Sequence, residues 1–171
     1  FGTAAGLLRP EELEEGRIRH ALFMTVPCVA RVNGRDHVYP AVGRARLCTD
    51  GRDAPHLGAR VQLAMSEEEI DALAGPAWRK TLLRAMAEYG MFVGDTGGPA
   101  GWALQTQSDT SYTSLGRPPR LEELAREAGW QPYHDEHVGR TVYIGDLASG
   151  VDWAGRLRVI DPCVSEGTCG G

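Results

Sequence analysis

The sequence predicts an α+β domain in which a mainly antiparallel or mixed, sandwich-like β-sheet carries two or three packed helices. The first observation is that residues 76–89 have apolar side chains at helical spacing and lead straight into the apolar run 91–95. The second is that several other short segments alternate between apolar and polar residues, as half-buried strands do. These strands and helices do not form regular βαβ units, which favours an α+β architecture over a doubly wound sheet.

The helix predicted over 76–89 has one apolar face and clear ends. Pro76 suits the first helical turn, and Gly90 suits the position just past the last turn, where a left-handed backbone is needed. The stripe expected to face the core consists of Trp78, Leu82, Leu83, Met86 and Tyr89. The charged residues expected on the opposite side are Arg79, Lys80, Arg84 and Glu88.

The chain before this helix is predicted to contain short elements joined by turns. In order, these are an arm over 1–9, a helical turn over 10–15, strands over 17–26 and 59–63, and a short helix that starts with the capping box Ser66–Glu69. Between the two strands, Asn33-Gly34 predicts a hairpin turn, and Tyr39-Pro40 predicts a bend or a sheet edge. Residues 49–58 are rich in turn formers and predict a surface loop with a solvated His56.

The chain after the helix is predicted to add strands and one further helix. The strands over 91–95 and 101–106 are separated by a tight turn, so we expect them to pair as a hairpin. The remaining segments are a mobile polar loop over 107–119, a helix over 119–128, and strands over 141–146 and 156–160.

Composition narrows the class of protein. The 171 residues, of which 42% are hydrophobic and 24% charged, suit a single domain over 1–171. A net charge of -5 without a basic patch argues against nucleic-acid binding, and no apolar run approaches the length of a membrane span. Neither nucleotide-binding glycine motif is present, and no cofactor is predicted. GxSxG is also missing, which argues against a serine hydrolase of that type.

The four cysteines predict an oxidised, exported protein. They are Cys28, Cys48, Cys163 and Cys169, and none of their spacings is CxxC, which leaves little support for a zinc ribbon or a thioredoxin site. The simplest interpretation is two local disulfides, one within the loop after the first strand and one closing the C-terminal tail. Buried free thiols are the alternative.

Two residues are candidate acid–base catalysts, His20 and Asp95. His20 belongs to an apolar row of the strand over 17–26, and Asp95 leaves the buried strand over 91–95, where partial desolvation can tune a pKa. Both have a structural alternative that we favour. A core histidine is usually satisfied by a backbone partner, and the aspartate can accept a hydrogen bond from nearby amides in the turn.

The aromatic residues Tyr89, Trp102 and Tyr112 are candidate substrate-binding residues, because sugar faces stack on aromatic rings and these side chains can line a groove near the candidate catalysts. A metal site is also considered at residues 134–137, the run His-Asp-Glu-His, since imidazole and carboxylate groups ligate transition metals. Flanking Pro132 and Gly139 predict a solvated loop there, so no metal is assigned.

The order of four phrases resembles a family of secreted, largely uncharacterised actinobacterial proteins. The phrases are GRIRHAL at 16–22, Pro40-Ala41, GARVQL at 58–63 and YGMFVGDTGG at 89–98. The resemblance covers roughly residues 5–105 and matches the C-terminal part of those proteins. It implies an extracellular protein whose fold is completed by an N-terminal segment or partner chain, with Phe1 marking a processing site. The family adds no established activity.

Two classes of function are therefore expected. The first is a secreted enzyme that acts on an extracellular polymer such as a polysaccharide, by hydrolysis or elimination, with His20 and Asp95 as acid and base on a common rim. The alternative is a non-catalytic extracellular binding or structural subunit that assembles through its edge strands, as a homo-oligomer or with a partner chain. Whether the protein is an enzyme is left open by the sequence.

Overall fold

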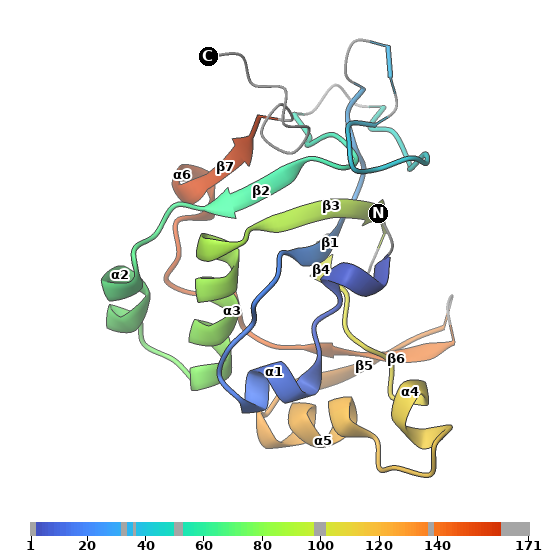
Figure 1. Cartoon of the computed structure of the whole chain (residues 1–171), viewed down its shortest axis with the longest axis vertical. Coiled ribbons are helices and arrows are strands. Elements are labelled where there is room, and N and C mark those ends of the chain that lie inside the picture. Colours follow the sequence, from blue (N-terminus) through green and yellow to red (C-terminus); the bar gives the residue numbers. More distant parts are fainter. Residues whose placement is uncertain are drawn as a thin grey trace.

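The computed structural model describes residues 3–31, 34–35, 37–49, 53–97, 102–136 and 139–161. It confirms the α+β class, with a mixed five-stranded sheet in the order β4-β1-β3-β2-β7 and a separate antiparallel hairpin of β5 and β6 (Figure 1). The strands are β1 Leu22–Val26, β2 Arg60–Leu63, β3 Met91–Thr96, β4 Ala103–Leu104, β5 Gln131–Asp135, β6 Arg140–Ile144 and β7 Leu157–Ile160. The helices are η1 Thr3–Gly6, α1 Pro10–Glu14, α2 Glu67–Ala72, α3 Ala77–Glu88, α4 Thr110–Thr113, α5 Arg120–Glu127 and α6 Trp153–Arg156.

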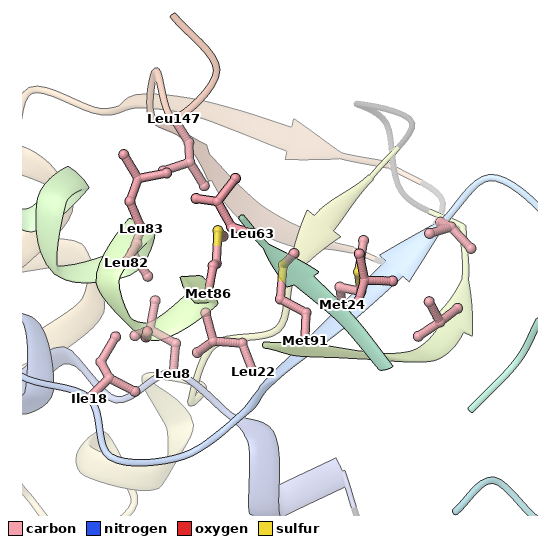
Figure 2. Packing of buried hydrophobic residues seen from close by; sticks show 14 of the residues in the cluster. Leu8, Ile18, Leu22, Met24, Leu63, Leu82, Leu83, Met86, Met91 and Leu147 are labelled. Atoms are coloured by element: carbon pink, nitrogen blue, oxygen red, sulfur yellow. The ribbon is translucent and has the colours of Figure 1, made fainter. Parts of the chain in front are cut away.

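Helix α3 packs across one face of the sheet, as predicted. Its buried side chains Leu82, Leu83 and Met86 lie toward side chains of the sheet, among them Leu22 and Met91 (Figure 2). Pro76 precedes the helix, and Gly90 follows it with a φ of 76°, a conformation that favours glycine. The capping box is also confirmed, because the Ser66 side chain accepts a hydrogen bond from the Glu69 amide at the start of α2.

The centre of the sheet is β1, and this overturns the predicted hairpin of 91–95 with 101–106. Strand β3 pairs in parallel with β1, and β4 pairs with the other edge of β1, so β1 lies between the two segments. All five residues of β1 are buried, and a strand buried on both faces is stabilised by neighbours on both edges. The short β4 therefore closes the outer edge of β1 instead of pairing with β3.

Other segments also differ from the sequence predictions. The strand expected over 17–26 begins only at Leu22, and the polar segment 107–119 contains helix α4. Residues expected to form a loop around 131–135 form β5, which pairs with β6, and α6 was not predicted. The expected arm does pack, since Leu8 is buried and its amide donates to the Gln105 carbonyl oxygen at 2.9 Å.

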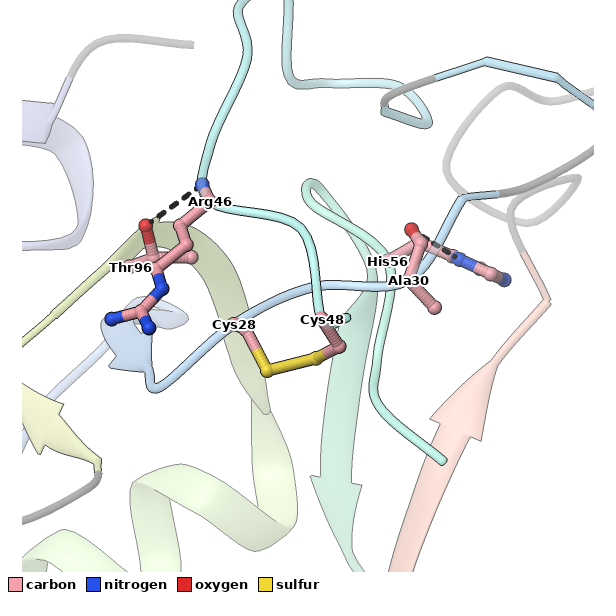
Figure 3. Close-up of a disulfide and its surroundings, with 6 residues drawn as sticks. All are labelled: Cys28, Ala30, Arg46, Cys48, His56 and Thr96. Atoms are coloured by element: carbon pink, nitrogen blue, oxygen red, sulfur yellow. Dashed lines mark hydrogen bonds between the residues drawn. A yellow bond between two sulfur atoms is a disulfide. The ribbon is translucent and has the colours of Figure 1, made fainter. Parts of the chain in front are cut away.

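The segment between β1 and β2 contains no named strand in its described residues, so the hairpin expected around Asn33-Gly34 is not seen in them, and Asn33 itself lies outside them. Isolated bridges join Val29 to Leu47 and Ala30 to His56. His56 is half-buried, not solvated, and its Nδ1–H donates to the Ala30 carbonyl oxygen at 3.1 Å (Figure 3). The segment is thus held by backbone and side-chain bonds without a ladder.

A disulfide joins Cys28 to Cys48, as predicted (Figure 3). Beside it, the Cys48 amide donates to the Val29 carbonyl oxygen at 3.0 Å, and the Arg46 amide donates to Thr96 Oγ1 at 3.1 Å. The disulfide therefore secures a long loop against the carboxyl ends of β1 and β3. The second predicted pair, Cys163 and Cys169, lies outside the described residues.

Within the described ranges, the helices are too short or too polar to cross a bilayer.

The replacement Gly94→Ala is expected to destabilise the fold, because a Cβ at this position would lie 2.1 Å from the Phe23 ring. We expect a loss of about 1–3 kcal/mol in the free energy of unfolding, measured by urea denaturation. When Phe23 is replaced by leucine, Gly94→Ala should cost less free energy of unfolding than it does in the parent. Gly43→Ala is the matched control, since nothing lies within 4 Å of its added Cβ. An unchanged midpoint in Gly94→Ala would contradict the packing of β1 against β3.

Replacing both Cys28 and Cys48 by serine is expected to lower the free energy of unfolding by about 3 kcal/mol, because the crosslink closes a loop with a sequence separation of 20. The comparison is made by denaturant unfolding of the double variant and the oxidised parent. Reduction of the parent should reproduce the effect of the double variant. Equal stability of all three forms would show that the loop is held by its hydrogen bonds alone.

Candidate functional site

His20 lies just before β1 and joins that strand to helix α1. Its Nε2–H donates to Glu12 Oε1 at 2.9 Å, and its Nδ1–H donates to the Ala21 carbonyl oxygen at 3.0 Å. The same carboxylate accepts a hydrogen bond from the Arg9 amide at 3.0 Å, at the start of α1. Because both ring nitrogens have protein partners, the arrangement supports the structural interpretation of His20.

Asp95 lies at the other end of the parallel strand pair. Its exposed carboxylate accepts a hydrogen bond from the Thr96 amide at 2.7 Å, which is the local bond expected of a structural role. In the register of β1 and β3, Leu22 is opposite Met91 and Thr25 is opposite Asp95. His20 therefore precedes the residue opposite Asp95 by five positions, or about 16 Å along a strand. The structure does not bring His20 and Asp95 to a common rim.

Only one of the three aromatic residues proposed to line a groove does so. Tyr112 is buried, and its hydroxyl donates to Glu11 Oε2 at 2.8 Å. Tyr89 follows the last residue of α3, where its carbonyl oxygen accepts a hydrogen bond from Arg60 Nε at 2.9 Å, and a hydrogen bond to Glu88 raises the pKa of its phenol. Trp102 is half-buried and lines a cleft.

This cleft has a volume of about 930 Å³. Its lining residues come from the first part of α3, from β4 and from the two strands of the β5–β6 hairpin, with residues 145–149 completing one side. Three of the four tryptophans of the chain line it: Trp78, Trp102 and Trp130. The fourth, Trp153, packs on Trp102 with ring centroids 5.7 Å apart.

Trp78 and Trp130 form an edge-to-face pair in the cleft. Their ring centroids are 5.1 Å apart at an interplanar angle of 80°, a favourable aromatic geometry. Gly145 allows this approach, because a Cβ there would lie 2.7 Å from Trp130 Nε1 and 3.0 Å from the Trp78 ring. Both indole nitrogens are buried, and neither has a hydrogen-bond partner among the described residues. Both residues are half-buried, so they contribute ring surface to the cleft while their N–H groups are out of reach.

Arg79 holds the loop 145–149 that forms one wall. Arg79 was predicted to lie on the side of α3 opposite the core, but it is only 4% exposed. Its guanidinium donates to the carbonyl oxygens of Leu147 at 3.3 Å and Ala74 at 2.8 Å, and also to that of Ser149. The loop turns its carbonyls inward, and this gives a buried guanidinium the acceptors that it requires.

Asp146 is the single carboxylate among the described residues that line the cleft. Its Oδ2 accepts a hydrogen bond from Ser149 Oγ at 2.6 Å, and its Oδ1 accepts one from the Ser149 amide at 3.0 Å. These hydrogen bonds, that of the Ser149 hydroxyl first, hold the pKa of Asp146 below its ordinary value. The exposed side chain is therefore ionised at neutral pH and fixed in direction.

The run at 134–137 is placed differently from the predicted loop. His134 is exposed on β5, and His137 lies outside the described residues. Among the residues whose positions the structure gives, no group of three histidine, cysteine, aspartate or glutamate side chains gathers closely enough to hold a metal ion.

Three residues of the cleft were missed by sequence reasoning about function. Trp78 was assigned to the core stripe of α3, and Trp130 and Asp146 were assigned no role. The one available signal was that the chain contains four tryptophans although only 7% of its residues are aromatic. Their gathering depends on the β5–β6 hairpin, which the local pattern did not predict.

Comparison of the chain with protein-family models, with characterised proteins and with solved structures finds no match. The candidate site is therefore assessed on its geometry alone.

The hydroxyl of Tyr112 should make stability depend on pH in the alkaline range. Burial, followed by the hydrogen bond to Glu11, raises the pKa of Tyr112 to about 12. Because the pKa in the unfolded chain is near 10, this contribution is complete below about pH 10 and is lost as the pH rises toward 12. At neutral pH we expect Tyr112→Phe to have a free energy of unfolding about 1 kcal/mol below that of the parent. Between pH 10 and 12 the free energy of unfolding of the variant should fall less than that of the parent, because the variant lacks the titrating hydroxyl.

The measurement is urea unfolding of both proteins across that pH range, with the difference between them isolating Tyr112 from other titrating groups. A constant difference at all pH values would contradict the burial of a neutral phenol against Glu11.

Proposed function

We propose that this protein is a non-catalytic extracellular module that binds a carbohydrate in the tryptophan-lined cleft. The observation that carries this proposal is the gathering of all four tryptophans at one place, three on the cleft wall and the fourth packed behind Trp102. Tryptophan contributes more binding energy per residue than most side chains, and a cleft of about 930 Å³ lies within the range that holds small ligands.

The chemistry of the cleft suits a sugar better than a purely apolar ligand. Sugar rings have an apolar face that packs on an indole, and they carry hydroxyl groups at their rims. Asp146 lies at the exposed side of the cleft, where its carboxylate can accept a hydrogen bond from a sugar hydroxyl. A purely apolar ligand has no donor to offer it.

Binding is favoured over hydrolysis because the acid–base groups are not in place. Glycoside hydrolysis by the usual route requires two carboxyl groups on either side of the scissile bond, and the described cleft residues include only Asp146. His20 and Asp95, the other candidate acid–base pair, are separated along β1 and β3. This leaves the binding alternative as the function that the geometry supports.

The extracellular location rests on the disulfide between Cys28 and Cys48. Disulfides of this structural kind persist in oxidising compartments and are rare in the cytosol. The resemblance to secreted actinobacterial proteins supports the same location.

A second candidate function is a subunit that assembles through an edge strand, as a homo-oligomer or with a separate N-terminal chain. Among the described strands, β7 pairs with β2 alone, and its Leu157 and Val159 are 37% and 60% exposed. An exposed edge with apolar side chains is a site where another strand can pair. Native mass spectrometry distinguishes this candidate, because a monomer at micromolar concentration would exclude the homo-oligomer.

The proposed function is tested by screening the protein against a panel of extracellular polysaccharides and their oligosaccharides, with tryptophan fluorescence and calorimetry. Trp102→Ala and Trp130→Ala should each weaken binding roughly tenfold or more, as expected for a central tryptophan. Tyr39→Ala is the matched aromatic control, since Tyr39 is 55% exposed and does not line the cleft.

Thermal unfolding of each variant shows whether the fold is kept, and chromatography of the ligand shows whether it is cleaved. Binding that is the same in the tryptophan variants and in the parent would contradict the assignment to this cleft, as would a parent that binds no member of the panel. Cleavage by the parent would replace the binding proposal by the enzymatic one.

A further inference from the structure

We propose that the carbohydrate bound in the cleft carries free amino groups, and that Asp146 receives the protonated amine of an amino sugar. This inference rests on the proposed function and narrows it to a class of polymer, one built from glucosamine-like units that are not acetylated.

Asp146 accepts hydrogen bonds within the protein and can still accept one from a ligand. Ser149 donates to both carboxylate oxygens, at 2.6 Å from its hydroxyl and at 3.0 Å from its amide. The Ala148 amide also donates to this carboxylate, and because a carboxylate has about four lone-pair sites, one is left for a further donor. The side chain is exposed and lines the cleft, so an incoming group can reach it.

The ligand meets one exposed charge in the cleft, and it is negative. The charged residues among the described cleft residues are Arg79 and Asp146. Arg79 is 4% exposed, and its Nε, Nη1 and Nη2 all donate to carbonyl oxygens, so it offers little to an anionic ligand. An ammonium group adds to its hydrogen bond with the Asp146 carboxylate the attraction of a full opposite charge, which a neutral hydroxyl lacks.

The aromatic residues around Asp146 favour the same kind of ligand. Three tryptophans line the same cleft, and an indole face that is open to a ligand attracts a cation through its negative quadrupole potential. Tyr143 also lines the cleft, and burial raises the pKa of its phenol, so it stays neutral. The net charge of the protein, -5, adds a long-range attraction for a polymer with many ammonium groups.

The charge of Asp146 also interacts with the buried guanidinium of Arg79. Arg79 contributes positive potential to the cleft, and Asp146 offsets it, because the two charges influence each other. In Asp146→Asn the amide would still accept a hydrogen bond from a sugar hydroxyl, whereas an ammonium group would lose its counter-charge.

The test compares three hexasaccharides of the same linkage and length: the β-1,4-linked oligomer of glucosamine, its fully N-acetylated form, and the oligomer of glucose. Binding is measured by calorimetry at about pH 5.5, where amines are protonated and most carboxylates are ionised. In the parent, the glucosamine oligomer should bind roughly tenfold more tightly than either neutral oligomer at low salt, and this ratio should fall as salt screens the charges.

In Asp146→Asn the preference should disappear, with affinity for the glucosamine oligomer lost and affinity for the glucose oligomer changed less than about threefold. Glu15→Gln is the matched control, because it removes one exposed negative charge outside the cleft and should keep the preference. Thermal unfolding confirms that both variants are folded.

The outcomes separate this inference from the proposed function. Equal binding of the three oligomers, or a preference that survives in Asp146→Asn, overturns the role of Asp146 and leaves a neutral-sugar module standing. A preference lost equally in Glu15→Gln shows that only net charge matters and also overturns it. Failure of all three oligomers to bind, in a protein that binds another polysaccharide through its tryptophans, overturns the amino-sugar inference alone.

Discussion

The parallel pairing of β1 with β3 is the constraint on which the rest of the structure depends. Strand β1 is buried along its whole length, and its neighbours on the two edges are β3 and the short β4. On one face it packs against α3, and on the other Phe23 lies over Gly94. The two strands run in the same direction, so a residue before the start of β1 lies far from a residue at the end of β3. His20 and Asp95 have these two positions.

A buried guanidinium connects this core to the cleft. Arg79 belongs to α3, which packs on the sheet, and it donates to the carbonyl oxygens of residues 147 and 149 in the loop that forms the cleft wall. Removing a charge from water is costly unless acceptors replace the solvent, so the loop and the arginine depend on each other. The position of Asp146 follows from this, since it lies in the same loop and is oriented by Ser149.

The sequence predicts the local elements better than their partners. Helix α3, the capping box at Ser66, β2 and β7 follow from periodicity and from the chemistry of helix ends, which act within a few residues. The pairing of β4 with β1 instead of β3 depends on contacts between residues about 80 positions apart, and no local pattern contains that information. For the site, aromatic stacking was predicted at Trp102, but Tyr112 was mistaken for a groove residue because its burial against Glu11 is a tertiary contact. Arg79 was misplaced for the same reason: helical spacing does not reveal a loop that brings carbonyls to the polar side.

Trp78 belongs both to α3 and to the cleft, and this links occupancy to folding. A ligand that contacts only the folded arrangement of Trp78 and Trp130 shifts the equilibrium between folded and unfolded chains by mass action. At a concentration one hundred times its dissociation constant, such a ligand adds about 2.7 kcal/mol to the free energy of unfolding. Since α3 also covers the sheet, a bound ligand of the proposed kind would raise the resistance of the whole domain to heat and to proteolysis.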